Sequence, residues 1–206
     1  MLNFLENHDE QRFASPFFAG DADKAIPALV VATMMSTGPM MIYFGQELGE
    51  RGDDAEGFSG HDGRTTIFDY WSVPAVRQWY DGGRCSVAKL TPGQKRLRNL
   101  YKTILNIGRR EKAVGQGSFF DLMYVNGENP RFNPHRHYAF LRKYGNELLV
   151  IAVNFDTHPA EAAINLPGHA FDTMKIAAGQ YASTELISGE KATKELSPEA
   201  PFSTTI

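Results

Sequence analysis

An imidazole and a carboxylate stand next to each other near the start of the sequence, at His8 and Asp9. They follow a short apolar run at residues 2–5, which is typical of a buried parallel strand that ends in a functional loop. Together with Glu47 and His61 they supply the ligand types of a metal-dependent hydrolase, which elemental analysis would reveal. The alternative without chemistry is a turn in which Asp9 caps the next segment.

Two further groups have the ligand types of a metal site. His135 and His137 would lie on one face of a strand, but no third His or Cys lies close to them in the sequence. Asp53, Asp54 and Glu56 are acidic enough for calcium, but they lack the spacing of a calcium-binding loop. We therefore predict no metal site and no cofactor within this chain, and we interpret the acidic group as surface charge.

The elements that position the His-Asp pair are predicted to alternate between strand and helix. Asp23 can cap a helix, and the apolar run at residues 40–44 predicts a second strand after it. Residues 45–91 form a long connection rich in Gly and Asp, and loops of that length are usually functional. Thr91 and Pro92 are then typical of the start of another helix.

After Gly115 the apolar residues recur with a period of two, which is typical of half-buried strands. Turn-forming residues such as Gly145 and Asn146 separate these segments. Short strands at this spacing predict an antiparallel sandwich or barrel. The predicted strands are residues 119–125, 137–143, 147–155, 160–166, 184–187 and 192–196.

Two motifs resemble signature regions of one enzyme family. Residues 4–12 (FLENHDEQR) resemble the fourth sequence region of the α-amylase family of glycoside hydrolases, and residues 38–47 (GPMMIYFGQE) are similar to its eighth-strand signature. The resemblance implies an α/β plus all-β fold. Residues 1–112 would form the last two β/α units of a (β/α)8 TIM barrel, and residues 113–206 an antiparallel β-sandwich domain. Residues 201–206 depart from the family pattern, so we expect the sandwich to lack its last strand.

The resemblance also implies a function for the parent protein, which is the hydrolysis of α-1,4-glucosidic bonds in starch or maltooligosaccharides with retention of configuration. By this resemblance His8 donates hydrogen bonds to sugar hydroxyls at the cleavage site. Asp9 accepts from the 2- and 3-hydroxyls and stabilises the transition state. We expect Glu47, Arg64 and Trp71 to bind substrate as well.

The two residues that break the bond are not expected in this chain. In the family, the nucleophilic Asp and the acid/base Glu follow the fourth and fifth barrel strands, which would precede residue 1. We therefore expect the isolated chain to be inactive, and the resemblance allows calcium only in the parent protein. A transglycosylase of the same family would share this half of the site. The alternative from another class is a non-catalytic carbohydrate-binding β-module, which ligand bound on the sandwich aromatics would favour.

Composition limits the partners. A formal net charge of -3 provides no basic face for nucleic acid and no polybasic membrane patch. The longest apolar stretch, residues 26–35, is too short to cross a bilayer, and the first residues do not read as a signal peptide, so no compartment is indicated. We expect an α-glucan oligosaccharide or polysaccharide as partner. The strands at residues 2–5 and 40–44 would lack their barrel neighbours, so we also predict self-association through this exposed edge.

Overall fold

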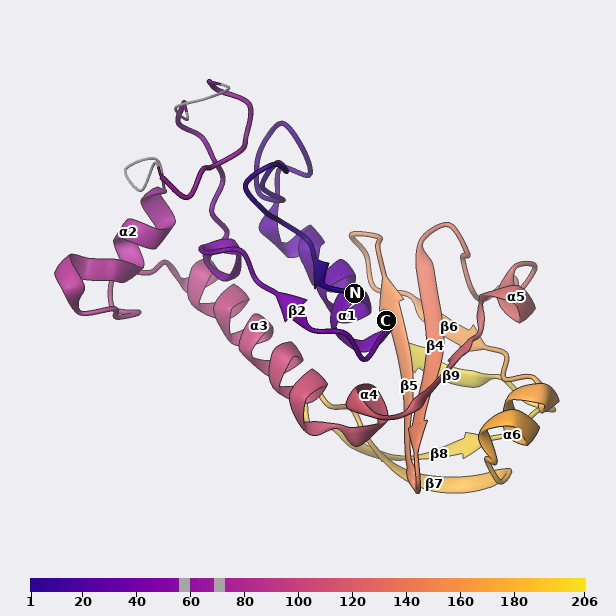
Figure 1. Ribbon diagram of the computed structural model, residues 1–206. Helices are drawn as coiled ribbons and strands as arrows, with labels where there is room; N and C mark the ends of the chain where they lie inside the picture. Colours follow the sequence, from indigo (N-terminus) through magenta and orange to yellow (C-terminus); the bar gives the residue numbers. More distant parts are fainter. Residues whose placement is uncertain (56–59, 69–72) are drawn as a thin grey trace. The chain divides into compact units, whose positions relative to one another are not determined.

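Two compact units make up the chain in the computed structural model (Figure 1). The structure describes residues 1–55, 60–68 and 73–206. Unit 1 comprises residues 1–33 and 38–105, and unit 2 comprises residues 34–37 and 106–206. Unit 1 combines helices with a two-stranded parallel sheet, whereas the strands of unit 2 pair antiparallel. The expected domain boundary after residue 112 stays a prediction.

A parallel pair of short strands begins unit 1. Strand β1 (Asn3–Phe4) pairs with β2 (Met40–Met41), and both are shorter than the predicted runs. The chain crosses between them through a 3-10 turn, η1 (Ala22–Lys24), and helix α1 (Ala25–Met34), because parallel neighbours need such a connection. The predicted cap at Asp23 is wrong. Asp21 is the cap, and its Oδ1 accepts from the Asp23 N–H at 3.0 Å, since the 3-10 turn starts the helical segment earlier.

Among the described residues, three short helical segments of unit 1 lie within the long connection, and helix α3 (Pro92–Arg110) follows it. Helix α3 begins where it was predicted, and the Gln94 N–H donates to Thr91 Oγ1 at 3.2 Å while Gln94 Oε1 accepts from the Thr91 N–H at 2.9 Å. This reciprocal pair is a capping box. The elements are η2 (Gln46–Leu48), α2 (Pro74–Tyr80), η4 (Asp81–Gly83) and α3 (Pro92–Arg110), which continues into unit 2.

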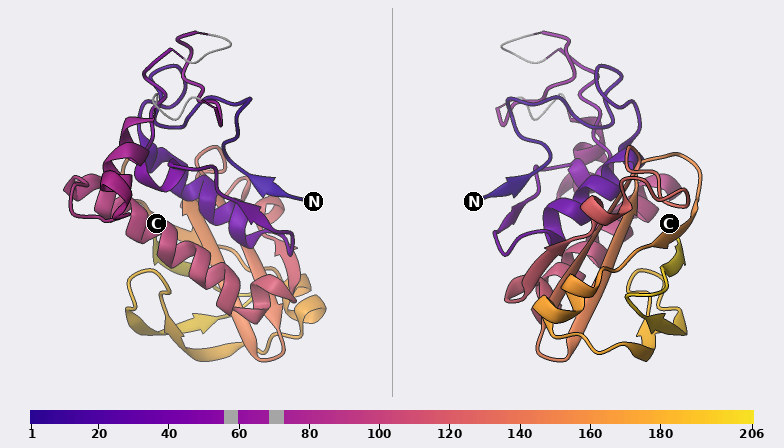
Figure 2. Two further views of the ribbon diagram at one scale, coloured as in Figure 1. Left: turned by 60° about the vertical axis from the view of Figure 1, so that its left-hand side comes forward. Right: turned by 90° about the vertical axis from the view of Figure 1, so that its right-hand side faces the viewer.

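The main sheet of unit 2 confirms the predicted antiparallel order. Strand β4 (His137–Tyr144) pairs with β3 (Ser118–Asp121) on one side and with β5 (Glu147–Asn154) on the other. The long hairpin of β4 and β5 is seen from two further sides in Figure 2, and Gly145 and Asn146 form its predicted turn. The strand predicted to continue to Val125 ends early, because Asp121 Oδ1 accepts from the Met123 N–H at 2.9 Å and the next residues form a helix.

Short elements complete unit 2, and several of them differ from the prediction. Strand β6 (Glu161–Ile164) pairs with β9 (Phe202–Thr205), a C-terminal strand that the sequence pattern did not predict, so the expected absence of a final strand is wrong. The strand predicted at residues 184–187 is wrong, because Thr184 is the last residue of β7 and residues 186–188 form a turn. The elements are α4 (Lys112–Gly115), α5 (Met123–Asn126), β6 (Glu161–Ile164), α6 (Gly168–Met174), β7 (Gly179–Thr184), β8 (Lys191–Leu196) and β9 (Phe202–Thr205).

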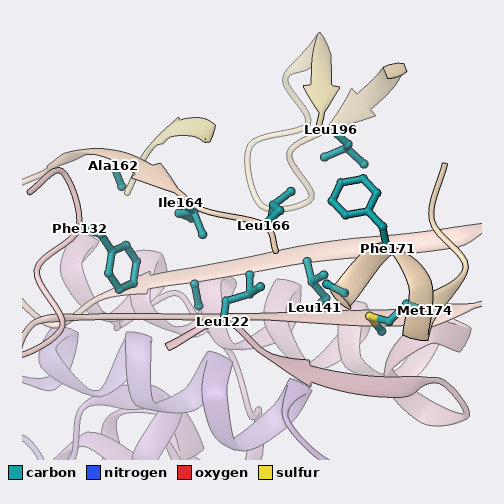
Figure 3. Packing of buried hydrophobic residues seen from close by; sticks show 11 residues of the cluster. Leu122, Phe132, Leu141, Ala162, Ile164, Leu166, Phe171, Met174 and Leu196 are labelled. Carbon is teal, nitrogen blue, oxygen red and sulfur yellow. The ribbon is translucent and has the colours of Figure 1, made fainter. Parts of the chain in front are cut away.

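An apolar core lies between the layers of unit 2. In Figure 3, Ile164 and Leu166 from the β6 side point toward Leu122 and Leu141 on the side of the main sheet. Phe171 of α6 closes the same core. Two antiparallel layers with buried side chains between them match the layering that a sandwich requires. In the described ranges, no helix has the length and apolar character needed to cross a bilayer.

Candidate functional site

A buried ion pair closes the loop after β1 at its base. Glu6 and Arg12 are 2% and 0% exposed, and Arg12 Nη1 donates to Glu6 Oε2 at 2.9 Å. The second carboxylate oxygen of Glu6 accepts from the backbone N–H of Phe13 at 2.8 Å. The two ends of the loop are therefore tied to each other, and residues 7–11 form the segment between them.

Asn7 shapes the tip of this loop. Its Oδ1 accepts from the backbone N–H groups of Asp9 at 2.7 Å and of Glu10 at 3.0 Å, which is an Asx turn. The side chains of His8 and Asp9 project from the turn and are 61% and 75% exposed, with His8 Nε2 3.5 Å from Asp9 Oδ2. The capping role that the alternative without chemistry assigned to Asp9 thus belongs to Asn7.

Arg12 connects the loop after β1 to residues 62–65 of the long connection. Its backbone N–H donates to the carbonyl of Gly63, and its Nε donates to Thr65 Oγ1, both at 2.8 Å. The guanidinium carbon lies 4.2 Å from the ring centroid of Tyr43, a cation–π contact, and Tyr43 Oη donates to the Thr65 carbonyl at 2.6 Å. The loops that follow β1 and β2 therefore extend to one side of unit 1 (Figure 1).

The predicted substrate-binding residues fall into three situations. Arg64 lies in the segment tied to Arg12, and its Nε donates to Asp62 Oδ2 at 2.7 Å, while its Nη atoms make no hydrogen bond to a described residue. Glu47 lies in η2, the next element after β2, and is half-buried. Trp71 lies outside the described residues.

Buried polar groups fix the turn that carries Glu47. Gly45 has a φ of 82°, and a Cβ at this position would lie 2.6 Å from Cγ2 of Val76, so only glycine fits. Glu50 is 1% exposed, and its Oε2 accepts from the N–H groups of Ala75 at 2.9 Å and Val76 at 3.3 Å. These donors begin α2, where a carboxylate also interacts favourably with the helix dipole. The Glu50 side chain therefore links the turn that carries Glu47 to the start of α2.

Burial dominates the electrostatics of the two buried carboxylates. Loss of solvation raises the pKa of Glu6 above its usual value, although the Arg12 charge and the hydrogen bonds from Arg12 and Phe13 act in the opposite direction. The nearby charge of Glu47 raises the pKa of Glu6 further. Loss of solvation likewise raises the pKa of Glu50.

The candidate metal ligands do not gather. Among the residues that the structure describes, no three His, Cys, Asp or Glu side chains lie close enough to hold a metal ion, so the four ligands of the metal-dependent hydrolase do not form a site. One of them, His61, packs its ring on Phe17, with 5.4 Å between centroids. His137 accepts from the Asn133 N–H through Nδ1 at 3.1 Å, whereas His135 precedes the strand. Glu56 lies outside the described residues.

Comparison with known families identifies the segment that carries the site. Residues 1–84 match the family profile described as "Alpha amylase, catalytic domain". The resemblance of this segment to the α-amylase family is confirmed. This α-amylase segment includes the anchored loop with His8 and Asp9, and it also includes Glu47 and Arg64.

Solved structures of α-amylase-family enzymes share the fold of the whole chain. AmyP in complex with maltose has a TM-score of 0.62 and 16% identity, and a noncanonic maltogenic α-amylase, AmyB, from Thermotoga neapolitana has 0.60 and 13%. Each alignment covers 100% of this chain and only 38% of the other. Isomaltulose synthase from Klebsiella sp. LX3 has a TM-score of 0.54 at 21% identity, covering 100% of this chain and 41% of the synthase. No curated protein sequence matches the chain.

At these identities the likeness shows the fold alone, and the assignment of residues 1–112 to two units of a barrel stays a prediction. The sequence patterns also left out three residues that organise the site, Glu6, Arg12 and Glu50. Glu6 and Arg12 lie within the FLENHDEQR motif, so that motif is the feature of the sequence that could have pointed to them. Nothing local in the sequence connects Arg12 to Thr65, because 53 positions separate them.

Proposed function

We propose that this chain supplies the sugar-binding side of an α-glucan active site in an α-amylase-type retaining enzyme. The observation that carries the proposal is the His8–Asp9 pair, which projects 61% and 75% exposed from a turn whose base is a buried ion pair. The pair lies in the segment that matches the α-amylase catalytic domain. An exposed donor and acceptor on a fixed base suit the recognition of a polyhydroxylated ligand.

In this proposal Asp9 accepts hydrogen bonds from two neighbouring hydroxyls of the sugar at the cleavage site, and His8 donates to a hydroxyl of the same ring. Contacts of this kind strengthen as the ring approaches its oxocarbenium-like transition state, and they lower the barrier by several kcal/mol. Arg64 can donate further hydrogen bonds to the sugar through its Nη atoms, which bond to none of the residues that the structure describes. Glu47 and Trp71 are proposed to contact the substrate beside them.

Cleavage needs two further carboxylates, the nucleophile and the acid/base. In the family these follow the fourth and fifth barrel strands, whereas the motifs of this chain resemble those of the seventh and eighth strands. We therefore propose that the chain acts on starch-like or maltooligosaccharide substrates only as part of a larger active site. Maltose bound to AmyP supports an α-glucan ligand, while the shared fold of isomaltulose synthase supports the alternative of a transglycosylase.

A titration of the chain with maltotriose, followed by backbone amide NMR signals, tests the proposal. Asp9→Asn removes the proposed acceptor, and Glu10→Gln is the matched control, because Glu10 is also exposed and also donates its N–H to Asn7. Charge-assisted hydrogen bonds contribute about 1.5–3 kcal/mol each, so Asp9→Asn should weaken binding by roughly 10–100-fold. Glu10→Gln should bind as the unmodified chain does.

Two results would refute this proposal. One is equal affinity of the Asp9→Asn variant and the unmodified chain for maltotriose. The other is a set of ligand-induced shifts confined to unit 2, which would favour the non-catalytic carbohydrate-binding β-module instead.

A further inference from the structure

We infer that Arg12 is a positioning residue for the sugar-binding turn, acting through Glu6 and Thr65 on the placement of His8 and Asp9. The inference rests on the proposed function for its consequence in binding, but its structural basis is independent. Arg12 is 0% exposed, so it cannot touch a sugar itself. Its effect on a ligand must pass through the residues that it holds.

Arg12 makes three directed contacts with two different segments. Its Nη1 bonds to Glu6 at the start of its own loop, while its Nε and backbone N–H bond to Thr65 and Gly63. The planar guanidinium also lies over the ring of Tyr43. A lysine would keep the charge but lose the fork geometry and the stacking, so the site needs arginine in particular.

The turn has few other supports. Within residues 7–11, the Asx turn of Asn7 is local, whereas Gln11 Nε2 reaches another segment by donating to the Asp62 carbonyl at 3.1 Å. The His8 and Asp9 side chains are mostly exposed and add little packing. The order of the turn therefore depends on its base, where Arg12 joins both ends to residues 62–65.

The energetics of Arg12 favour a positional role over a purely stabilising one. Burying a charged pair costs solvation that its attraction often does not exceed, so such pairs are weak evidence for stability. Arg12 Nη2 is also buried without a hydrogen bond to any described residue. An apolar residue would avoid both costs, but it would lose the fixed geometry of the loop.

The test uses the 206-residue chain and four variants. Thr65→Val removes the acceptor of Arg12 Nε, Thr65→Ser restores a hydroxyl, and Arg12→Lys keeps the charge. Arg96→Gln is the control, because it removes an exposed ion pair with Asp23 in the same unit. For each variant we would measure the exchange rates of the Asp9 and Glu10 amide hydrogens, the urea midpoint of unfolding, and the dissociation constant for maltotriose.

We expect Thr65→Val and Arg12→Lys to accelerate exchange at Asp9 and Glu10 by about tenfold or more and to weaken maltotriose binding by a similar factor, as loss of a hydrogen bond to a charged group implies. Thr65→Ser should restore both, and Arg96→Gln should change neither. If Arg12→Lys does not fold, the two Thr65 variants decide.

Unchanged exchange at Asp9 and Glu10 in Thr65→Val would overturn the inference. So would acceleration spread evenly over all amides of unit 1, since that would indicate general destabilisation. If the unmodified chain does not bind maltotriose while exchange responds as expected, the proposed function is wrong and the positioning role stands. If Asp9→Asn abolishes binding and Thr65→Val leaves it unchanged, the positioning role is wrong and the proposed function stands.

Discussion

Asn126→Ala should destabilise unit 2 far more than the size of the change suggests. Asn126 is 0% exposed, and its amide uses its full hydrogen-bonding capacity. Its Nδ2 donates to the carbonyls of Leu122 at 2.8 Å and Asn165 at 3.1 Å. Its Oδ1 accepts from the Asn165 N–H and from Asn129 Nδ2, both at 2.8 Å. One side chain thus connects α5 with the chain segment that follows β6.

The expected magnitude follows from these four bonds. A typical hydrogen bond contributes about 0.5–1.5 kcal/mol, so the network adds roughly 2–6 kcal/mol to the free energy of unfolding. Asn129 Nδ2 keeps its second bond, to the Ala163 carbonyl at 2.6 Å, so its loss is partial. We expect a decrease of about 3 kcal/mol, a large fraction of the ~5–15 kcal/mol that stabilises a typical domain.

Urea unfolding followed by circular dichroism and by NMR signals of unit 2 measures this decrease. Tryptophan fluorescence would not report on unit 2, because Trp71 and Trp79 both fall within the residue range of unit 1. Gln180→Ala is the control, since Gln180 is exposed on β7. A decrease below about 1 kcal/mol for Asn126→Ala would refute the assigned network.

Three further predictions concern the site and unit 1. The isolated chain should not release chromophore from a chromogenic maltooligosaccharide above background, and turnover that Asp9→Asn abolishes would contradict the proposed division of the active site. Burial raises the pKa of Glu50 in the folded state above its usual value of 4.5. The stability that the protonated Glu50 contributes is therefore present below pH 4.5 and is lost as the pH rises through the pKa of the folded state. The urea midpoint of unfolding should decline over this pH range, and Glu50→Gln should reduce the decline. Leu2, which precedes β1, and Phe4 within it are 49% and 42% exposed, so light scattering should show that the chain associates as its concentration rises; a strict monomer at all concentrations would contradict this prediction.

Local sequence signals predicted the parts of the fold that local physics determines. The helix start at Thr91 and Pro92 and the turn at Gly145 and Asn146 depend on neighbouring residues, and both formed where they were expected. Apolar alternation could not distinguish α5 from a longer β3, because the end of the strand coincides with a bond from the Met123 N–H to Asp121 Oδ1 that the alternation does not register. Strand β9 escaped prediction since its extended state depends on pairing with β6, almost forty positions away.

The site was predictable to the extent that chemistry and strand ends coincide in sequence. His8 and Asp9 drew attention because polar residues follow an apolar run and because the two motifs resemble those of one family; the structure places them on an exposed turn, and their role in binding stays a prediction. Their supports were not found, because Arg12 reaches Thr65 across 53 positions and no period or composition links such partners. Residues that hold a site through distant contacts leave no local pattern.

The site separates two demands that a single side chain cannot meet together. If His8 and Asp9 bind sugar as proposed, they must keep their hydrogen-bonding capacity available for the ligand, and each bond that they form within the protein would have to break on binding. Groups with few bonds are mobile, which adds an entropic cost to every complex. Here the buried residues Glu6 and Arg12 and the turn-forming Asn7 make the bonds instead, and they restrict the backbone beneath the two exposed side chains. His8 and Asp9 can thereby offer a donor and an acceptor to the sugar from a fixed position. A change at Asp9 should weaken the proposed sugar complex by removing the acceptor, and a change at Arg12 should weaken it by releasing the backbone that positions the acceptor.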